Sequence, residues 1–437
     1  MDYLRALGGV AFIIGIAYAL SGNRRAVDWR LVGFGILLQI AFALLTGKVE
    51  ATQQAFQYVS SKVVTFLGFA QDGAEFLYGD LARDSTRDPA VKHNLGFLFA
   101  FQALPTVIFF SAITAGLYYL GVLQKIVFAF AWIMARTMRL SGSESLSAAA
   151  NIFMGQTEAP LLVRPFIARM TQSELHCLMT GGMATIAGSV LGAYVAFLGG
   201  DSHEERAMFA SYLIGASIIN APAAILISKI IFPEAQHDQI DRRLQVSKEK
   251  IGVNLIDALA SGASDGLKLA LNIGAMLLAF IAIIYALNWI LVDFIGAYTG
   301  LNEFVVRTTQ GAYNGFSLQY ILGQVFRIFA FAIGVDWNEA LHVGSLLGQK
   351  VVINEFVAYL DLARMKEAGI LSEKAIRIST YALCGFANFS SIAIQIGGIG
   401  GMAPARQGDL SRLGLRAMVA ASLATMMSGA VAGALFS

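Results

Sequence analysis

Apolar residues form long runs along this chain, and eight of these runs approach or exceed the length at which a helix crosses about 30 Å of hydrocarbon. They cover residues 3–21, 31–46, 95–121, 172–198, 206–232, 266–292, 379–401 and 415–436, of which 31–46 is the shortest. Eight crossings place both ends of the chain on the same side of a bilayer. The pattern therefore predicts an all-α polytopic membrane protein with eight transmembrane helices.

Two other segments have the apolar and polar faces of helices that lie on a membrane surface. In residues 50–70 the apolar positions recur at helical spacing, and glutamine, serine and lysine fill the other side. These apolar positions are Phe56, Val59, Val63, Phe66 and Ala70. The spacing predicts an interfacial amphipathic helix on the outer surface, with a helix in a soluble loop as the alternative. Residues 122–140, which end in two arginines, predict a similar helix on the inner surface.

Two apolar segments, 142–168 and 338–362, are too interrupted to span, because each has a polar pair near its middle. Ser141 before the first segment is a plausible helix start. Pro160 fits the first turn of a second helix that begins near Thr157. Helix, polar tip and helix together predict a re-entrant hairpin, whose exposed backbone must line a protein cavity instead of contacting lipid.

These two segments open an ordered series of short motifs that occurs twice. The first series is Thr157-Glu158, Ala-Arg-Met at 168–170, Ser173-Glu174 and Gly182-Met183-Ala184-Thr185. The second is Asn354-Glu355, Ala-Arg-Met at 363–365, Ser372-Glu373 and Gly385-Phe386-Ala387-Asn388. The spacing drifts by six residues, and four matches in the same order indicate an internal repeat.

Three spanning runs lie between the two hairpins, and a hairpin that enters and leaves on one face adds no crossing. An odd number of crossings turns the second repeat upside down relative to the first. Paired, interrupted segments in an inverted repeat are typical of secondary transporters, with the site near the membrane midplane where the breaks meet. We therefore expect two opposed re-entrant hairpins whose tips converge.

The composition agrees with a membrane protein. Of the 437 residues, 57% are hydrophobic and 14% are charged, and the mean hydropathy is +0.64. A net charge of +2 gives no indication of nucleic-acid binding. The two cysteines lie in apolar runs and the five histidines lack metal-ligand spacing, so neither a disulfide framework nor a zinc site is indicated.

Basic loops favour one orientation in the membrane. Residues 22–30, 233–252 and 402–414 are rich in arginine or lysine and share one face if the N-terminus is outside. The basic stretch 361–378 lies on the opposite face and argues against this orientation. The first 22 residues resemble a signal peptide with a site at Ala17-Tyr18-Ala19, but the weakly charged start favours an uncleaved spanning helix. The linker 233–252 is predicted to be a solvated inner loop.

An acidic side chain near the bilayer centre costs on the order of 3 kcal/mol, so two at equivalent positions indicate function. Glu158 and Glu355 occupy the two hairpin tips, and we expect them to meet across a pseudo-two-fold axis. Polar neighbours gather with them: Asn151, Gln156, Thr157, Thr185, Asn354, Asn388, Ser390 and Ser391. In the alternative interpretation each Glu is a hairpin cap paired with a nearby arginine such as Arg164.

Carboxylates and amides suit hydroxyls, ring nitrogens and carbonyls, and no arginine at either tip could clamp an anion. Oxygens such as those of Asn151 and Thr185 suit Na⁺ in a broken-helix site. From these residues we expect a cation-coupled carrier of a polar, uncharged solute. A channel and an intramembrane enzyme are the alternatives, but paired hairpins favour alternating access and no HExxH or Walker motif is present.

At these positions the chain resembles the concentrative nucleoside transporter family. The matching stretches are GQTEAP at 155–160, NAPAA at 220–224, NEFVAY at 354–359 and CGFAN at 384–388. The resemblance implies a protein that is not an enzyme, a homotrimer in the bacterial inner membrane, and nucleoside uptake driven by Na⁺ or, in some members, H⁺. It also implies nucleosides such as uridine as substrates, no organic cofactor, and a transport domain that moves as an elevator against a scaffold.

The resemblance also implies roles for single residues. Gln156, Thr157 and Glu158 resemble the nucleobase contacts, with Val190 packing on the base. Glu355, Asn388 and Ser391 resemble the contacts to the ribose hydroxyls, with Phe386 beside base or sugar. The Na⁺ site resembles the side chains of Asn151 and Thr185 with the carbonyls of Met154 and Ile186.

By the same analogy, residues 1–121 form a scaffold with spans 1–3 and the outer amphipathic helix, and 122–232 form transport repeat 1 with the first hairpin and spans 4–5. Residues 233–300 hold the inner linker and scaffold span 6, and 301–437 form transport repeat 2 with the second hairpin and spans 7–8.

Overall fold

A computed structural model describes residues 2–47, 50–83, 98–200, 202–244 and 252–435, which form helices and turns without a strand. The helices of the first half are α1 (Asp2–Ala19), α2 (Trp29–Gly47), α3 (Glu50–Tyr78), α4 (Phe99–Gln102), α5 (Leu104–Tyr119), α6 (Val122–Met138), α7 (Gly142–Ala150), α8 (Arg164–Ile167), α9 (Gln172–Ala184), α10 (Gly188–Gly199) and α11 (His203–Ile231). Those of the second half are α12 (Leu255–Asn288), α13 (Ala297–Thr299), α14 (Leu301–Thr308), α15 (Leu318–Ala332), α16 (Ala340–Val352), α17 (Glu355–Glu367), α18 (Glu373–Leu383), α19 (Phe389–Met402) and α20 (Gln407–Leu435).

The predicted crossings correspond to these helices. Among the described residues, six helical segments are long and apolar enough to cross a membrane: Trp29–Gly47, Phe99–Tyr119, Gln172–Gly199, His203–Ile231, Leu255–Thr299 and Pro404–Leu435. The first span is the shorter helix α1, and the seventh is divided between α18 and α19. The expected all-α membrane architecture is therefore confirmed.

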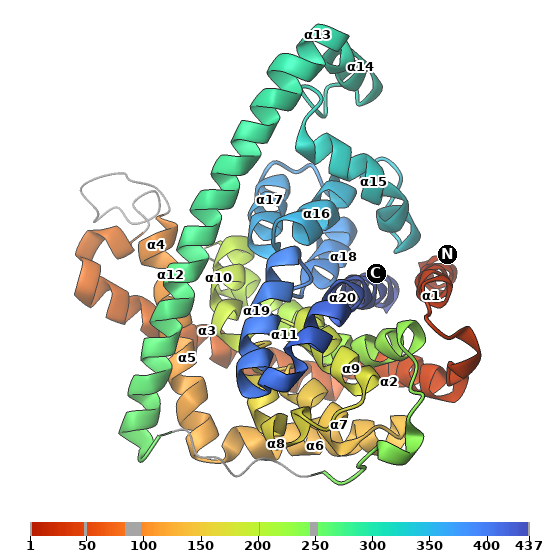
Figure 1. The fold of residues 1–437 in the computed structure, drawn as a ribbon. Helices are drawn as coiled ribbons and strands as arrows, with labels where there is room; N and C mark the ends of the chain where they lie inside the picture. Colours follow the sequence, from red (N-terminus) through yellow and green to blue (C-terminus); the bar gives the residue numbers. More distant parts are fainter. Residues whose placement is uncertain (1, 48–49, 84–97, 201, 245–251, 436–437) are drawn as a thin grey trace.

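The two hairpins enter from opposite ends of the protein. Hairpin 1, which contains α7 and α8, lies at the lower end in Figure 1, whereas α16 and α17 of hairpin 2 lie in the upper half. The long helix α12 runs from the lower end to the upper end beside them (Figure 1). This arrangement is the one that three intervening crossings produce, because they reverse the direction from which the second repeat enters.

Spans 4 and 7 are each interrupted near the middle, which the apolar runs did not indicate. The first breaks at Thr185, whose backbone is extended (φ −123°, ψ 166°), and restarts at Gly188. The second breaks after Leu383 and restarts where the Asn388 side chain accepts a hydrogen bond from the Ser391 backbone N–H at 2.9 Å. Both breaks fall on the repeated Gly-x-Ala-polar motif, so the motif marks an interruption that hydropathy does not detect.

The two breaks lie against each other. A Cβ atom added to Gly385, in the second break, would lie 2.9 Å from the carbonyl carbon and oxygen of Ala184 at the first. Only glycine allows this approach of backbone to backbone. The repeats therefore cross at their unwound segments.

The return arm of hairpin 1 differs from the expected regular helix. Ser141 does cap α7, in a reciprocal capping box with Glu144. Past the tip, however, the chain forms a 3₁₀ turn over Ala159–Val163 and only one α-helical turn in α8. Pro160 lies in the first turn of this arm, where proline is tolerated, but Pro165 lacks the backbone N–H that a continuous α-helix from the tip would need.

Helix α3 buries Ala70 and half-buries Phe56, Val63 and Phe66 of the expected apolar positions, and it also buries neighbouring residues. Small and medium-sized residues face the protein, including Ser60, Val64 and Ala74, whereas Val59 and Phe76 are exposed. In a membrane interface the large apolar side chains gain from facing lipid, and small residues let helices approach closely.

Most residues in the described part of the inner linker, 233–244, are exposed, as expected of a solvated loop, but its backbone also packs on hairpin 1. The backbone N–H of Gly142 donates to the Asp241 carbonyl at 2.8 Å, and a Cβ at Gly142 would lie 1.8 Å from the Arg243 carbonyl oxygen. The linker therefore lies directly on the first residue of hairpin 1. Residues 245–251 lie outside the described part of the chain.

Candidate functional site

Glu355 lies at the first position of α17, just after the tip of hairpin 2. The Asn354 side chain caps this helix by accepting from the Val357 backbone N–H at 3.0 Å. Glu355 is 2% exposed and accepts two hydrogen bonds, from the Tyr194 hydroxyl at 2.9 Å and from the Asn388 amide at 3.0 Å. Three elements, α10, α17 and the start of α19, therefore converge on one carboxylate.

The tip of hairpin 1 reaches the same place from the other repeat. The Gln156 side-chain amide donates to the Ser391 hydroxyl at 3.1 Å, three residues beyond Asn388. Its carbonyl accepts from the Gln395 amide at 3.1 Å, and Gln395 also donates to the Met179 backbone carbonyl at 3.0 Å. Side chains from both repeats thus form one hydrogen-bonded network across the pseudo-two-fold axis.

Glu158 is partly exposed beside this network and accepts from the Gly155 backbone N–H at 3.3 Å, which closes the turn of its own tip. Thr157 lies against α19, where a Cβ at Gly398 would lie 2.9 Å from the Thr157 methyl group. The network joins the two tips through Gln156, Ser391 and Asn388. Amides and hydroxyls make the contact between the repeats, whereas the Glu158 carboxylate bonds within its own tip.

The residues expected at the Na⁺ site lie together beside the first break. Thr185 donates its hydroxyl to the Gly181 carbonyl at 3.0 Å, and a Cβ at Gly181 would lie 3.5 Å from the Asn151 amide nitrogen. Asn151 is 1% exposed, and both of its side-chain polar atoms lack a hydrogen-bond partner. Within the described residues, no donor reaches the carbonyl oxygens of Met154 and Ile186.

This arrangement fits a small cation. A buried amide without partners is costly unless a ligand occupies the space beside it. Neutral oxygens from a side-chain amide, a hydroxyl and freed backbone carbonyls are the ligands that a hard monovalent cation prefers. These residues could therefore hold Na⁺.

The two expected apolar contacts also lie at the helix breaks. Val190 is in the first turn of α10, is 1% exposed, and lies one helical turn before Tyr194. Phe386 is partly exposed in the second break, two residues before Asn388. Both positions adjoin residues that bond Glu355.

Sequence reasoning missed two polar residues of the network, Tyr194 and Gln395, and the buried Lys350, which bonds Ala382 and Thr425. Tyr194 lies four positions after Val190, and Gln395 lies four positions after Ser391, so helical periodicity alone places each on the face of a predicted contact. Lys350 is a single cation in the apolar run before the tip of hairpin 2, and only its charge could have drawn attention to it.

A second polar cluster holds the base of hairpin 1. Lys229 of α11 pairs with Glu144 of α7, donates to the Ser173 hydroxyl at 2.9 Å and lies 3.7 Å from Glu234. Burial opposes ionisation of Glu234, but the Gln236 backbone N–H and Lys229 outweigh it and hold the pKa of this carboxyl below its usual range. The cluster fastens the inner linker and α11 to the start of the hairpin.

We predict that Lys229→Met destabilises the protein by about 3–5 kcal/mol, because it leaves the buried Glu144 carboxylate without a cation. The melting temperature in detergent would measure this. The matched control is Lys268→Met, which removes an ion pair to Asp265 that is exposed on both sides and should cost less than about 1 kcal/mol. Equal melting temperatures for the two variants would contradict the role of the cluster.

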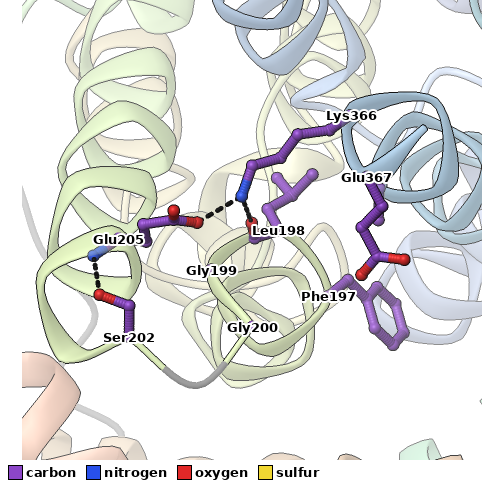
Figure 2. Close-up of a pocket in the computed structure, with 9 residues that line it drawn as sticks. Phe197, Leu198, Gly199, Gly200, Ser202, Glu205, Lys366 and Glu367 are labelled. Carbon is purple, nitrogen blue, oxygen red and sulfur yellow. Dashed lines mark hydrogen bonds and ion pairs between the residues drawn. The ribbon is translucent and has the colours of Figure 1, made fainter. Parts of the chain in front are cut away.

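A hollow at the opposite end of the repeats does not contain the network. Figure 2 shows Lys366 of α17 pointing to Glu205 of α11 and to the carbonyl of Leu198, to which it donates at 2.9 Å. Glu367 and Phe197 lie across the opening. This ion pair fastens the return arm of hairpin 2 to the turn between α10 and α11.

Family models match most of the chain. The Na⁺-dependent nucleoside transporter C-terminus matches residues 212–433, its N-terminus matches residues 8–81, and a nucleoside recognition model matches residues 100–201. The chain belongs to the Na⁺-dependent nucleoside transporter family. It is therefore a nucleoside transporter, not an enzyme, and a multi-pass membrane protein.

Relatives of this transporter cover its full length. An uncharacterized transporter of Haemophilus influenzae is 41% identical over 99% of this chain and 98% of its own, and the uncharacterized transporter YutK of Bacillus subtilis is 42% identical over 99% of both. Sodium/nucleoside cotransporter 1 of Sus scrofa is 38% identical over all of this chain, which spans 64% of the mammalian protein.

Solved structures of CNTnw have the same fold as this transporter. CNTnw in an inward-facing substrate-bound state is 40% identical, covers 99% of this chain with 98% of its own, and gives a TM-score of 0.87. A variant of CNTnw in an intermediate state gives a TM-score of 0.88 at 41% identity, with both chains fully covered.

Proposed function

We propose that this transporter is a symporter that imports nucleosides such as uridine and uses the Na⁺ gradient to drive uptake. The observation that supports it is the network from Gln156 through Ser391 and Asn388 to Glu355, with the partnerless Asn151 in the same repeat. A polar network built from two inverted repeats suits a solute with hydroxyls on one side and a heterocycle on the other. The mammalian relatives named as sodium/nucleoside cotransporters support the same coupling.

We assign the sugar to hairpin 2. Glu355 holds two neutral donors, and ribose hydroxyls could replace or join them with charge-assisted hydrogen bonds in a low-dielectric site. Asn388 and Ser391 would contact the sugar as well, and Phe386 would pack beside it. A site with these polar groups should reject an analogue without ribose hydroxyls, since its groups would be left unpaired.

We assign the base to hairpin 1. Gln156, Thr157 and Glu158 offer amide, hydroxyl and carboxylate groups to a heterocycle, and Val190 offers an apolar surface. Na⁺ at Asn151, Thr185 and the Met154 and Ile186 carbonyls would stiffen the same tip. Coupling then follows, because the ion stabilises the form of hairpin 1 that binds the base.

We propose that residues 122–232 and 301–437 move as the transport domain against a scaffold of 1–121 and 233–300. Helix α12 packs mainly along α5 and turns an apolar stripe of Leu271, Leu278 and Tyr285 outward. This stripe suits lipid or the partner helices of a homotrimer. The bacterial relatives support a location in the cytoplasmic membrane of a bacterium, and the basic loops favour an orientation with the N-terminus outside.

The proposal is tested with purified protein in liposomes at a fixed membrane potential. Labelled uridine should accumulate inside only with an inward Na⁺ gradient, and it should be recovered unchanged. Accumulation driven by a proton gradient without Na⁺ would identify an H⁺-coupled symporter instead. Uptake that does not saturate with uridine would indicate a channel.

A further inference from the structure

The carboxylate of Glu355 is buried, yet its direct partners are neutral. Its two hydrogen bonds come from a hydroxyl and an amide. Within the described residues no lysine, arginine or histidine lies within ion-pair distance of it. A buried carboxylate without a cation in direct contact must obtain electrostatic compensation from farther away.

Lys350 is a buried cation on the same hairpin, five residues before Glu355. It is 1% exposed, and its ammonium donates to the Ala382 carbonyl at 2.9 Å and to the Thr425 hydroxyl at 2.7 Å. No carboxylate in the described chain pairs with it directly. Glu355, which is 2% exposed, is the buried carboxylate that follows it on the same hairpin.

The inverted repeat provides an internal comparison. Ala382 lies three residues before Gly385, and Met179 lies three residues before the equivalent Gly182, so the two carbonyls are equivalent. The Met179 carbonyl is met by the neutral Gln395 amide at 3.0 Å. A neutral amide is therefore enough to satisfy the backbone carbonyl at this position. The use of a charged lysine, Lys350, at the equivalent position of the second repeat requires a separate explanation.

We propose that Lys350 is a positioning residue that keeps the Glu355 carboxylate charged and ready for the ribose hydroxyls. Anchored at the end of α18 and on α20, the ammonium acts through its field and does not contact the carboxylate. A direct ion pair would occupy the oxygens that the sugar needs. This inference rests on the proposed function, in which Glu355 binds the sugar.

The test uses Lys350→Gln, which keeps an amide donor, and Lys350→Arg, which keeps the charge. Binding of uridine and of 2′,3′-dideoxyuridine is measured by calorimetry in saturating Na⁺. Lys350→Gln should weaken uridine binding about 10-fold or more and leave the dideoxy analogue nearly unchanged, whereas Lys350→Arg should retain the discrimination. Full discrimination in Lys350→Gln would overturn the proposal.

A pH series separates this role from a structural one. Without the ammonium, the buried carboxyl takes up a proton more readily, so uridine binding by Lys350→Gln should improve more steeply than that of the wild type as the pH rises from 6 to 8. The other titratable groups facing Glu355 are the Tyr194 and Tyr359 hydroxyls and the Cys384 thiol, which are neutral in this range in their ordinary state. A flat profile in the variant would contradict the proposal.

If Lys350→Gln is too unstable for binding measurements, the melting temperatures of two variants test the proposal instead. The double variant Lys350→Gln/Glu355→Gln leaves no buried charge without compensation, so it should melt at a higher temperature than Lys350→Gln alone. A double variant that is no more stable would overturn the proposal. Wild-type protein that binds no nucleoside would instead refute the proposed function, so the two failures are distinguishable.

Discussion

Glu355→Gln should reduce uridine uptake by about 100-fold or more, because a neutral amide replaces the acceptor of two charge-assisted hydrogen bonds. The new amide also places an N–H group among the Tyr194 and Asn388 donors, which already face this side chain. Uptake of labelled uridine into proteoliposomes measures the effect.

The matched control for this variant is Glu303→Gln, which makes the same chemical change at an exposed position on α14. It should transport like the wild type. Both variants should elute from size exclusion as the wild type does, because glutamine has nearly the same volume as glutamate. Normal uptake by Glu355→Gln would remove this residue from the sugar site.

Asn151→Ala should raise the Na⁺ concentration for half-maximal uptake by about 10-fold or more, because it deletes one neutral oxygen ligand of the ion. Uridine affinity in saturating Na⁺ should change little. The Na⁺ dependence of uptake, measured at constant ionic strength with choline as the replacement, separates the two quantities.

Two substitutions at Thr185 serve as the matched pair for this prediction. Thr185→Ser keeps the hydroxyl that donates to Gly181 and should keep the Na⁺ dependence, whereas Thr185→Val should lose it. If Asn151→Ala and Thr185→Val both respond to Na⁺ like the wild type, the ion does not bind at the first break.

The architecture was predictable because the membrane restricts the choice of structure. Apolar runs that cross lipid must be helices. Because three such runs lie between the two hairpins, the second repeat must be inverted relative to the first. The repeated motifs alone place Glu158 and Glu355 at equivalent positions in the two hairpins. The expected convergence of the tips required only that the breaks of an inverted repeat meet at its axis.

Hydropathy could not show where the spanning helices unwind. Ile186 and Ala187 in the first break, and Phe386 and Ala387 in the second, are as apolar as the helices around them. The signal lay in the motif: Gly385 fits the close backbone approach and Asn388 caps the next helix. Such a signal can be interpreted only when the two halves are aligned.

Other features depend on tertiary contacts that have no local pattern. Tyr194 reaches Glu355 over 161 residues of chain, and Lys350 reaches Thr425 over 75. The polar composition of the linker indicates its exposed side chains but does not reveal that its backbone packs on Gly142. The composition of a segment indicates whether it faces water or lipid, whereas its packing depends on the residues that lie next to it in the folded protein.

The central claim is that an ion at the first break and a nucleoside at the joined tips share one site. Calorimetry of uridine binding at a series of Na⁺ concentrations, and of Na⁺ binding with and without uridine, tests it most directly. The account predicts that each ligand tightens the other by the same factor, as linkage requires. Uridine affinity that is equal in Na⁺ and in choline would contradict it.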